Sequence, residues 1–432
     1  MRRSPYDRDI LRLAVPALGA LAAEPVYVLV DTAIVGHLGV SPLAALAVAG
    51  TLLTGAFTLF NFLTYGTTAQ VARLHGARRE EEAAHVGAQA QWLALLIGAV
   101  LVVLVALLAR PLAVLMGAQG EVADGATTYL RIAALGAPAF MLASAGQGFL
   151  RGVGDLRTPL VILVAAHAVN VVLELLFVYG FDWGLAGSAW GTVIAQLGMG
   201  AAFLAVQLRA GWQRPVAAQM RRLARIGSEI AVRTTALLGS FLVASAVLAR
   251  VGPASLAAHQ IAFQLFVFLA LVLDALAIAA QVLVGRTLGA GDAAAAREAA
   301  TRVILWSVVL GAAFGVVLLA LGDAVPRLFT PDDAVVARAH EIWWLFAALM
   351  PANGAVFALD GILIGAGDTR FLAWGMVAAA AIYIPVALLA LHQGWGIFGV
   401  WCGLAGLIAM RLATCGGRFL GSRWARVGFA LP

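Results

Sequence analysis

Three polar side chains share one face of a long apolar segment, residues 158–179. His167, Asn170 and Glu174 are spaced three and four residues apart, so a helix places them in line on the same side. An amide beside a carboxyl group offers several oxygen atoms to a small cation, and the acid alone can hold a proton. We therefore predict that Asn170 and Glu174 bind a proton or a cation. His167 either relays that proton or simply packs in the bundle.

A further acid, Asp31, lies deep in the apolar segment 11–36, one helical turn after Tyr27. A carboxylate in the middle of a membrane helix costs about 2.5–3.5 kcal/mol on insertion scales, so such residues are rarely only structural. Pro16 removes one backbone hydrogen bond from the same helix and allows it to bend. We predict that Asp31 takes up a proton or a cation. The alternative is a buried, hydrogen-bonded residue near the extracellular end.

Two more acids, Asp274 and Asp360, lie in the segments 256–285 and 336–364. A carboxylate in a cavity of low dielectric constant favours organic cations over anions. We therefore predict that both acids attract cationic substrate. The alternative is that each acid is paired inside its own bundle. Glu24, which precedes Pro25, is left without an assigned role.

These residues must be positioned by membrane-spanning helices. The chain is 62% hydrophobic and only 12% charged, outside the usual range of soluble domains. Its apolar stretches are long enough to cross a bilayer as helices, which satisfy their own backbone hydrogen bonds. We predict twelve spans: 11–36, 43–72, 84–109, 126–150, 158–179, 185–208, 226–250, 256–285, 299–321, 336–364, 371–391 and 396–419.

An internal repeat organises these spans. A constant offset of 213 residues superposes the first half on the second, most clearly where Gly152–Arg157 meets Gly365–Arg370. Near the end the offset falls to 212, so that Trp183 meets Trp395. Six spans per copy is an even number, so the copies cross in the same direction and are related by an axis along the membrane normal. We expect an all-α membrane protein of two six-helix bundles related by this pseudo-twofold axis.

The acids are not repeated. Asp31 aligns with Ala244, and Glu174 aligns with Ala387. In the other direction, Asp360 aligns with the neutral amide of Gln147. The remaining pairs are Asn170 with Tyr383, and Asp274 with Asn61. The predicted coupling site therefore belongs to the first bundle alone, and the second bundle holds its own acids.

Charge predicts the orientation. Every basic side chain except histidine is arginine, and most arginines fall at the termini and in the even-numbered loops. The positive-inside rule then places both termini in the cytoplasm of a cell (inner) membrane protein. We predict an N-terminal lobe over 1–208, a cytoplasmic linker over 209–225 and a C-terminal lobe over 226–432. The linker is the one long polar stretch.

The same composition argues against several function classes. The positive balance of +6 follows from topology, and no soluble domain or aromatic-basic motif predicts nucleic-acid binding. A chain without lysine cannot carry a Walker motif, so it is not an ATP-driven pump of that kind. The two cysteines, Cys402 and Cys415, predict neither a disulfide framework nor a zinc site. We expect no enzymatic activity, no bound metal and no cofactor.

Several stretches resemble the multidrug and toxic compound extrusion (MATE) transporters, in particular their DinF-like branch. Arg12–Pro16 and Tyr27–Gly39 look like the first helix of that family. Similar stretches follow in family order over essentially the whole chain: Gly148–Gly152, Asn170–Glu174, Trp183–Gly187 through Thr192, Leu273–Gln281, and Asp360–Gly361 followed by Gly365–Gly367. Each stretch alone is unspecific, but the set and its order are fairly specific.

The resemblance implies a V-shaped pair of six-helix bundles that exports organic, often cationic compounds in exchange for protons or sodium. It implies a cation or proton site at Asp31, Asn170, Glu174 and Thr192, with Pro16, Tyr27, Tyr129, Gln147 and His167 in support. The chain has glutamate at 174 where the family usually has aspartate, which puts the choice of ion in doubt; the DinF-like branch favours protons. We expect a monomer whose partners are small organic substrates and the lipid bilayer. A lipid-linked precursor flippase and a gated channel are the alternative functions.

Overall fold

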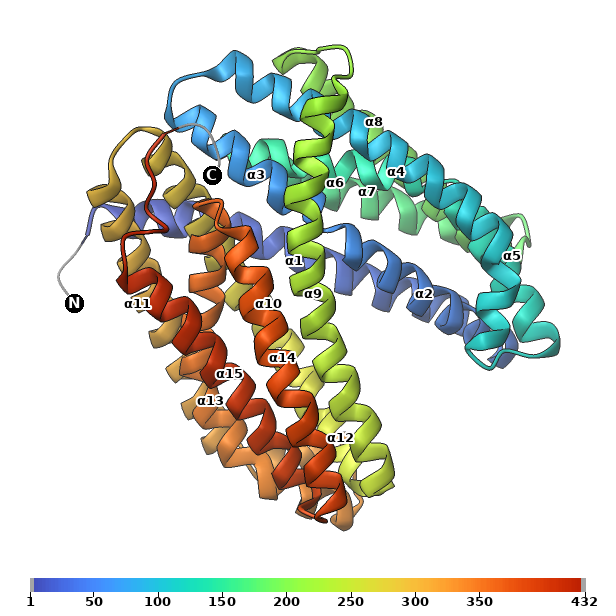
Figure 1. The fold of residues 1–432 in the computed structure, drawn as a ribbon. Helices are drawn as coiled ribbons and strands as arrows, with labels where there is room; N and C mark the ends of the chain where they lie inside the picture. The colour runs from blue at the N-terminus through green and yellow to red at the C-terminus, as the bar shows by residue number, and fades with distance from the viewer. Residues whose placement is uncertain (1–3, 429–432) are drawn as a thin grey trace. The chain divides into compact units, whose positions relative to one another are not determined.

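The computed structural model describes residues 4–428, and every regular element among them is helical. The elements are α1 (Tyr6–Gly36), α2 (Val40–Phe60), α3 (Phe62–Gly76), α4 (Glu80–Leu115), α5 (Gly120–Ala134), α6 (Ala137–Gly152), α7 (Arg157–Leu175), the π-helical turn η1 (Leu176–Gly180), α8 (Gly184–Ala210), α9 (Ala217–Val251), α10 (Pro253–Gly289), α11 (Ala293–Ala320), α12 (Ala324–Phe329), α13 (Asp333–Gly365), α14 (Thr369–His392) and α15 (Gly396–Leu420) (Figure 1).

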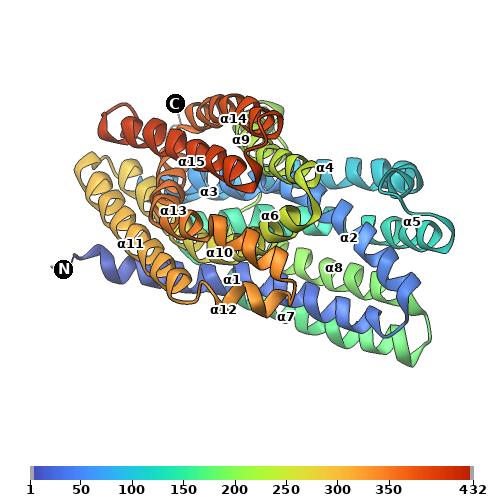
Figure 2. The ribbon, with the colours of Figure 1, turned by 90° about the horizontal axis from the view of Figure 1, so that it is seen from below.

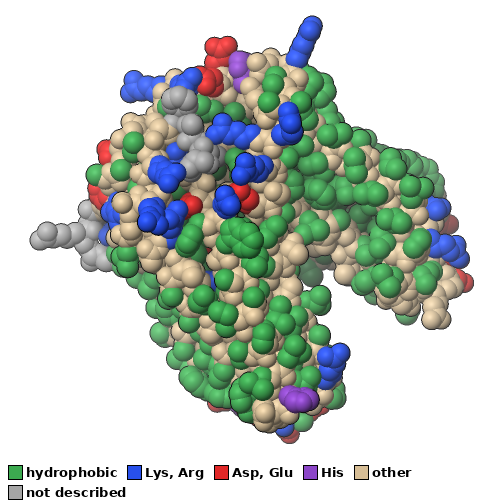
Figure 3. Space-filling model, in the orientation of Figure 1, with side chains coloured by type: hydrophobic (Ala, Val, Ile, Leu, Met, Phe, Trp, Pro, Cys, Tyr) green, Lys and Arg blue, Asp and Glu red, His purple; other side chains and the backbone are tan. Residues whose placement is uncertain are grey.

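The helices match the predicted spans. In the described part of the chain, eleven helices or continuous helix pairs are long and apolar enough to cross a membrane, and the bent pair α5 and α6 makes a twelfth. Hydrophobic side chains cover most of the visible surface, and the charged ones gather in a few places (Figure 3). Such a surface suits lipid rather than water. The predicted fold class, an all-α membrane protein with twelve spans in two bundles, is confirmed.

The two repeats differ in how straight their helices are. The span 40–76 is interrupted at Asn61, between α2 and α3, and α5 meets α6 at an angle of 52°. The corresponding helices of the second repeat, α10 and α13, are unbroken, even though α13 contains Pro351. Asn61, at which the first repeat's helix is interrupted, aligns with Asp274 of the second repeat. The two repeats therefore differ in backbone and in side chain at the same position.

The chain forms two compact units. The N-unit is Gly19–Ser228, and the C-unit combines the described residues up to Leu18 with those from Glu229 onward. Helix α1 therefore begins in the C-unit and ends in the N-unit, whereas α9 begins in the N-unit and ends in the C-unit. Each repeat thus lends the start of its first helix to the other unit. The lobe boundaries predicted above remain a prediction, and the non-helical connection spans only 211–216.

Specific contacts hold both exchanged helix starts. In the C-unit, Arg302 donates from Nε and Nη2 to the two oxygens of Asp7 at 2.6 and 2.7 Å. Trp306 Nε1 donates to Asp7 as well, at 2.9 Å. In the N-unit, Leu223 of α9 packs in a hydrophobic cluster that contains Leu63. Figure 2 shows the ribbon turned by 90°.

Glycine permits close helix packing in each unit. In the C-unit, α10 and α13 pack along one another, and a Cβ at Gly361 would overlap the carbonyl oxygen of Ala277. The repeat partner Gly148, on α6, would place its Cβ 2.7 Å from the carbonyl oxygen of Thr64 on α3. Small residues of this kind let membrane helices approach closely. Both bundles therefore use the same contact.

Candidate functional site

Asp31 lies in the part of α1 that belongs to the N-unit, and its side chain is buried there. Ser188 on α8 donates its hydroxyl to Asp31 Oδ1 at 2.8 Å. Long apolar runs on either side of Asp31 form one continuous helix. Packing of this helix in the N-unit buries the carboxyl group. That Asp31 takes up a proton or a cation remains a prediction.

Glu174 and Asn170 come from α7 and are buried beside Thr192 of α8. With its amide oriented as its neighbours require, Asn170 Nδ2 donates to Glu174 Oε1 at 2.9 Å, and its Oδ1 accepts the backbone N–H of Thr192 at 3.0 Å. Thr192 Oγ1 lies 3.4 Å from Glu174 Oε1. The three predicted residues therefore form one hydrogen-bonded group.

The local backbone helps to place Glu174. Helix α7 changes to the π-helical turn η1 at Leu176, two residues after Glu174. Single π-helical turns inside helices occur frequently at functional sites. On the neighbouring α8, Gly191 brings its backbone close to Glu174, since a Cβ there would lie 3.1 Å from Glu174 Cγ. The carboxyl group is thus enclosed by backbone as well as by side chains.

Aromatic side chains complete the group. The hydroxyl of Tyr27 on α1 is 3.0 Å from Thr192 Oγ1. His167 stacks on the ring of Tyr27, with centroids 4.8 Å apart and planes 12° from parallel. Tyr129 of α5 is buried beside Thr192 and Ser188. The helices α1, α5, α7 and α8 therefore converge on a single polar site, which we call the N-unit site: Tyr27, Asp31, Tyr129, Asn170, Glu174, Ser188 and Thr192.

The two acids of the N-unit site lie near one another. The carboxyl groups of Asp31 and Glu174 are close enough to interact electrostatically. Two like charges that are buried near one another cannot both be ionised without a large cost, which favours a proton on one of them. The second oxygen of Glu174 is buried and makes no hydrogen bond within the described chain. The arrangement can hold and release a proton.

Two of the predicted supporting residues, Gln147 and Pro16, are not members of this group. Gln147 of α6 accepts a hydrogen bond from Arg151 Nη2 at 3.1 Å. Pro16 lies in the part of α1 that belongs to the C-unit, and the helix continues unbroken through it. Glu24, to which no role was assigned, is exposed on α1. The supporting roles of Gln147 and Pro16 remain predictions.

Asp360, in the C-unit, is already paired. Arg233 of α9 and Arg411 of α15 both donate Nη2 to Asp360 Oδ2. This is the alternative that the sequence left open, an acid paired inside its own bundle. Two guanidinium groups contact this carboxylate, and its predicted role toward cationic substrate remains a prediction. Asp274, half-buried on α10, retains its predicted role only as a prediction.

Sequence reasoning missed three residues of these sites. Ser188 precedes Thr192 by one helical turn on α8, and that spacing was a usable signal for a shared face. Arg233 and Arg411 lie inside predicted spans, where a charged side chain calls for a partner. Their position indicated that they were paired. Which acid they pair with depends on how α9, α13 and α15 pack together.

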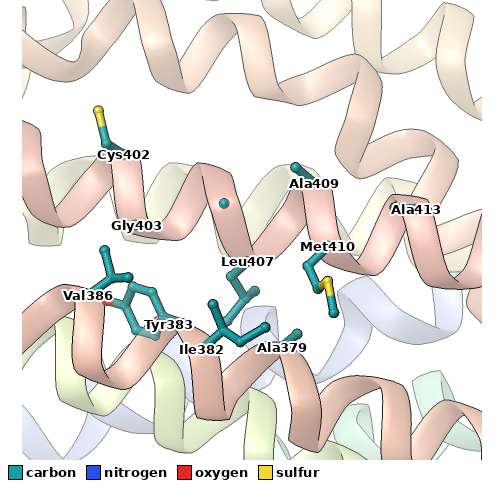
Figure 4. A pocket seen from close by; sticks show the side chains of 11 residues that line it. Ala379, Ile382, Tyr383, Val386, Cys402, Gly403, Leu407, Ala409, Met410 and Ala413 are labelled. Atoms are coloured by element: carbon teal, nitrogen blue, oxygen red, sulfur yellow. The ribbon is translucent and has the colours of Figure 1, made fainter.

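A groove with a volume of about 380 Å³ lies between α14 and α15 of the C-unit (Figure 4). It is lined mainly by apolar side chains, with Tyr383 and Cys402 as the polar exceptions. None of the predicted site residues contributes to it. The groove therefore offers no group that could exchange a proton for substrate.

This chain matches known proteins along most of its length. The family model described as MatE matches residues 16–176 and 230–389. The chain is 31% identical over 437 residues to the protein DETOXIFICATION 44, chloroplastic, of Arabidopsis thaliana, covering 96% of this chain and 82% of that protein. It is 30% identical over 439 residues to the DNA damage-inducible protein F of Escherichia coli, covering 97% and 92%. A probable multidrug resistance protein NorM of Bradyrhizobium diazoefficiens is 30% identical over 454 residues, covering 96% and 94%.

Solved structures show the same fold. A crystal structure of MATE in the bent conformation has a TM-score of 0.88 at 21% identity, covering 98% of this chain and 95% of that one. A transporter of the MOP superfamily from Pyrococcus furiosus, described as having a binding pocket of reverse polarity, has a TM-score of 0.85 at 20% identity, covering 98% and 96%. At these identities the likeness concerns the fold alone.

Proposed function

Because this chain belongs to the MATE family of multidrug efflux transporters, we propose that it exports small organic compounds by alternating access in exchange for protons. Family members are transporters rather than enzymes, and this chain is a multi-pass membrane protein. The arginine distribution supports a cell-membrane location with both termini in the cytoplasm. We propose that the transporter acts as a monomer.

The observation that carries the proposal is the pair of carboxyl groups in the N-unit site. Asp31 and Glu174 come from different helices, interact electrostatically and are surrounded by hydroxyl and amide groups. Neutral donors of this kind can follow a change of charge by reorienting, because a hydroxyl can donate or accept. The site is therefore suited to gain and lose a proton without losing its helix packing. This argument favours protons over sodium.

Helix α1 is the element through which protonation can reach the rest of the protein. Asp31 lies near its end in the N-unit, whereas its start is held in the C-unit by the contacts of Asp7. Pro16 lies two residues before the last α1 residue of the C-unit, where a missing backbone hydrogen bond makes bending easy. Protonation removes a charge from the N-unit site, and α1 then bends near Pro16.

Coupled transport in proteoliposomes tests the proposal. Asp31→Asn keeps the shape of the side chain but cannot exchange a proton, so we expect export driven by a pH gradient to be abolished while folding is intact. Glu24→Gln is the matched control, since Glu24 is an exposed acid on the same helix, and it should transport as the wild type does. A panel of dyes with imposed pH or sodium gradients identifies the ion. Wild-type export rates in Asp31→Asn would make Asp31 structural and overturn the proposal.

A further inference from the structure

A single carboxylate ties the start of α1 to α11. Arg302 donates to both oxygens of Asp7, so this ion pair is bidentate. Trp306, one turn further along α11, adds its indole N–H, and the backbone N–H of Ser4 donates to Asp7 Oδ2 at 3.1 Å. All of these residues belong to the C-unit. We call Asp7, Arg302 and Trp306 the α1 anchor; the start of α1 and α11 lie side by side (Figure 1).

A second ion pair at the start of α1 is much more exposed. Arg286 of α10 reaches Asp9 at 3.4 Å, and the exposed fractions of these side chains are 41% and 43%. In the α1 anchor the corresponding fractions are 14% for Arg302 and 22% for Asp7. Exposed ion pairs contribute little, whereas bidentate pairs fix distance and orientation together. The position of the helix start therefore depends on Asp7 rather than on Asp9.

The equivalent contact in the N-unit is apolar. The offset of 213 places Met220 of α9 where α1 has Asp7, and Leu93 of α4 where α11 has Trp306. Met220 packs against the hydrophobic cluster that contains Leu93. Apolar packing at this place therefore suffices to hold an exchanged helix start. Since a shielded ion pair is weak evidence of a gain in stability, the charges of the α1 anchor call for another reason.

The two exchanged helices differ in what they carry. Helix α1 leads to Asp31, whereas α9 has Ala244 at the aligned position. Apolar contacts are not directional, so they hold a helix without fixing its register, whereas hydrogen bonds to a carboxylate also fix its orientation. At about 1.5 Å per residue, Asp7 and Asp31 lie roughly 36 Å apart along the helix axis. The directional contact thus occurs on the helix that carries a coupling acid at its other end.

We propose that the α1 anchor is the fixed point through which protonation of the N-unit site reaches the C-unit. Asp7, Arg302 and Trp306 are then positioning residues for coupled transport. With the anchor intact, bending near Pro16 acts on the C-unit; with the anchor broken, the same bending only displaces the start of α1. The proposal rests on the proposed transport function and adds the contact that transmits it.

Export in proteoliposomes tests the role of Asp7. Asp7→Asn removes the bidentate ion pair, so we expect the initial rate of dye export under a pH gradient to fall about tenfold or more. Equilibrium binding of the same dye should keep its wild-type dependence on pH, because the N-unit site is unchanged. Asp9→Asn is the matched control, since it removes the same charge from the same first turn of α1, and it should export as the wild type does.

Arg302→Lys separates position from charge. Lysine keeps the positive charge but lacks the planar fork that binds a carboxylate with two parallel hydrogen bonds, so we expect it to export as slowly as Arg302→Gln. Asp7→Glu restores a carboxylate and should recover part of the rate. Full export by Arg302→Lys, or equal losses in Asp7→Asn and Asp9→Asn, would reduce the anchor to a matter of net charge and overturn the proposal.

A spin label at the start of α1 tests the anchor without transport. Ser4→Cys takes the label in a background of Cys402→Ser and Cys415→Ser, which removes both natural cysteines. We expect Asp7→Asn to mobilise the label in the electron paramagnetic resonance spectrum, and Asp9→Asn to leave it unchanged.

Two further outcomes would contradict the proposal. An immobile label in Asp7→Asn would show that the helix start is held by other contacts. Loss of pH-dependent dye binding together with export would make the anchor a general requirement of the fold. The label needs no ion gradient, so a failure of proton coupling in the Asp31→Asn experiment leaves its result standing. If sodium drives the wild type, the export rates are compared under a sodium gradient.

Discussion

Within the N-unit site, Ser188 holds Asp31 by a single hydroxyl group. Its hydrogen bond of 2.8 Å goes to an acid, and hydrogen bonds to charged groups are worth about 1.5–3 kcal/mol. The serine therefore positions the carboxyl group for its contact with Glu174. Burying a serine costs little free energy, so its presence in an apolar helix did not mark Ser188 as a site residue.

We predict that Ser188→Ala slows coupled export about tenfold or more, because Asp31 loses the donor that holds it. The measurement is the initial rate of dye transport under an imposed pH gradient. Ser144→Ala is a matched control, since Ser144 donates to the backbone of its own helix, at Phe140, and should behave as the wild type. Ser188→Thr restores the hydroxyl and should recover much of the rate; a full rate in Ser188→Ala would remove this hydroxyl from the site.

The cost of burial determined which residues could be found from the sequence. Asp31 and Glu174 stood out because a carboxylate in an apolar helix is expensive, and the structure brings both into one site. The helical spacing of Asn170 and Glu174 also placed them correctly on one face. Asp360 stood out for the same reason, but its partners come from helices far apart in the chain. Periodicity does not contain that information.

At the scale of helices, the long spans followed from hydrophobic length alone. The interruption at Asn61 and the bend of 52° between α5 and α6 did not. An apolar stretch satisfies the same length requirement whether it is straight or bent, and the bend depends on packing against neighbours. The exchanged starts of α1 and α9 were also hidden, because the repeat offset pairs residues without saying in which bundle each packs.

The crossing of α10 and α13 gives a prediction for stability. In Gly361→Ala the added methyl group meets the carbonyl oxygen of Ala277. The next nearest atoms are also backbone atoms of Ala277, which cannot move aside as a flexible side chain would. We expect the free energy of unfolding to fall by about 1–3 kcal/mol, as in other overpacked interiors. Thermal unfolding in detergent measures the change. Gly239→Ala on α9 has no atom within 4 Å of the new methyl group and should unfold like the wild type; equal midpoints for both variants would contradict the packing described here.

At the scale of the whole molecule, proton and substrate should influence one another. If protonation bends α1 and lowers the affinity for substrate, substrate must lower the affinity for the proton by the same factor. Glu174→Gln imitates the protonated state of one acid. We therefore predict that it lowers substrate affinity at high pH and flattens the dependence of affinity on pH. Equilibrium binding of a dye between pH 6 and pH 9 measures this, and a wild-type pH dependence in the variant would exclude Glu174 from the mechanism.

The exchanged helix starts bear on the ancestry of the chain. Each half lends the beginning of its first helix to the other unit, which is the pattern of domain swapping between two copies of one protein. An ancestor of half this length could have built both units as a swapped homodimer, before gene fusion joined the copies. The junction at 211–216 would then be a late addition that keeps two partners together. Once joined, each copy was free to change alone, which accounts for a carboxyl pair at Asp31 and Glu174 that aligns with Ala244 and Ala387 in the other copy.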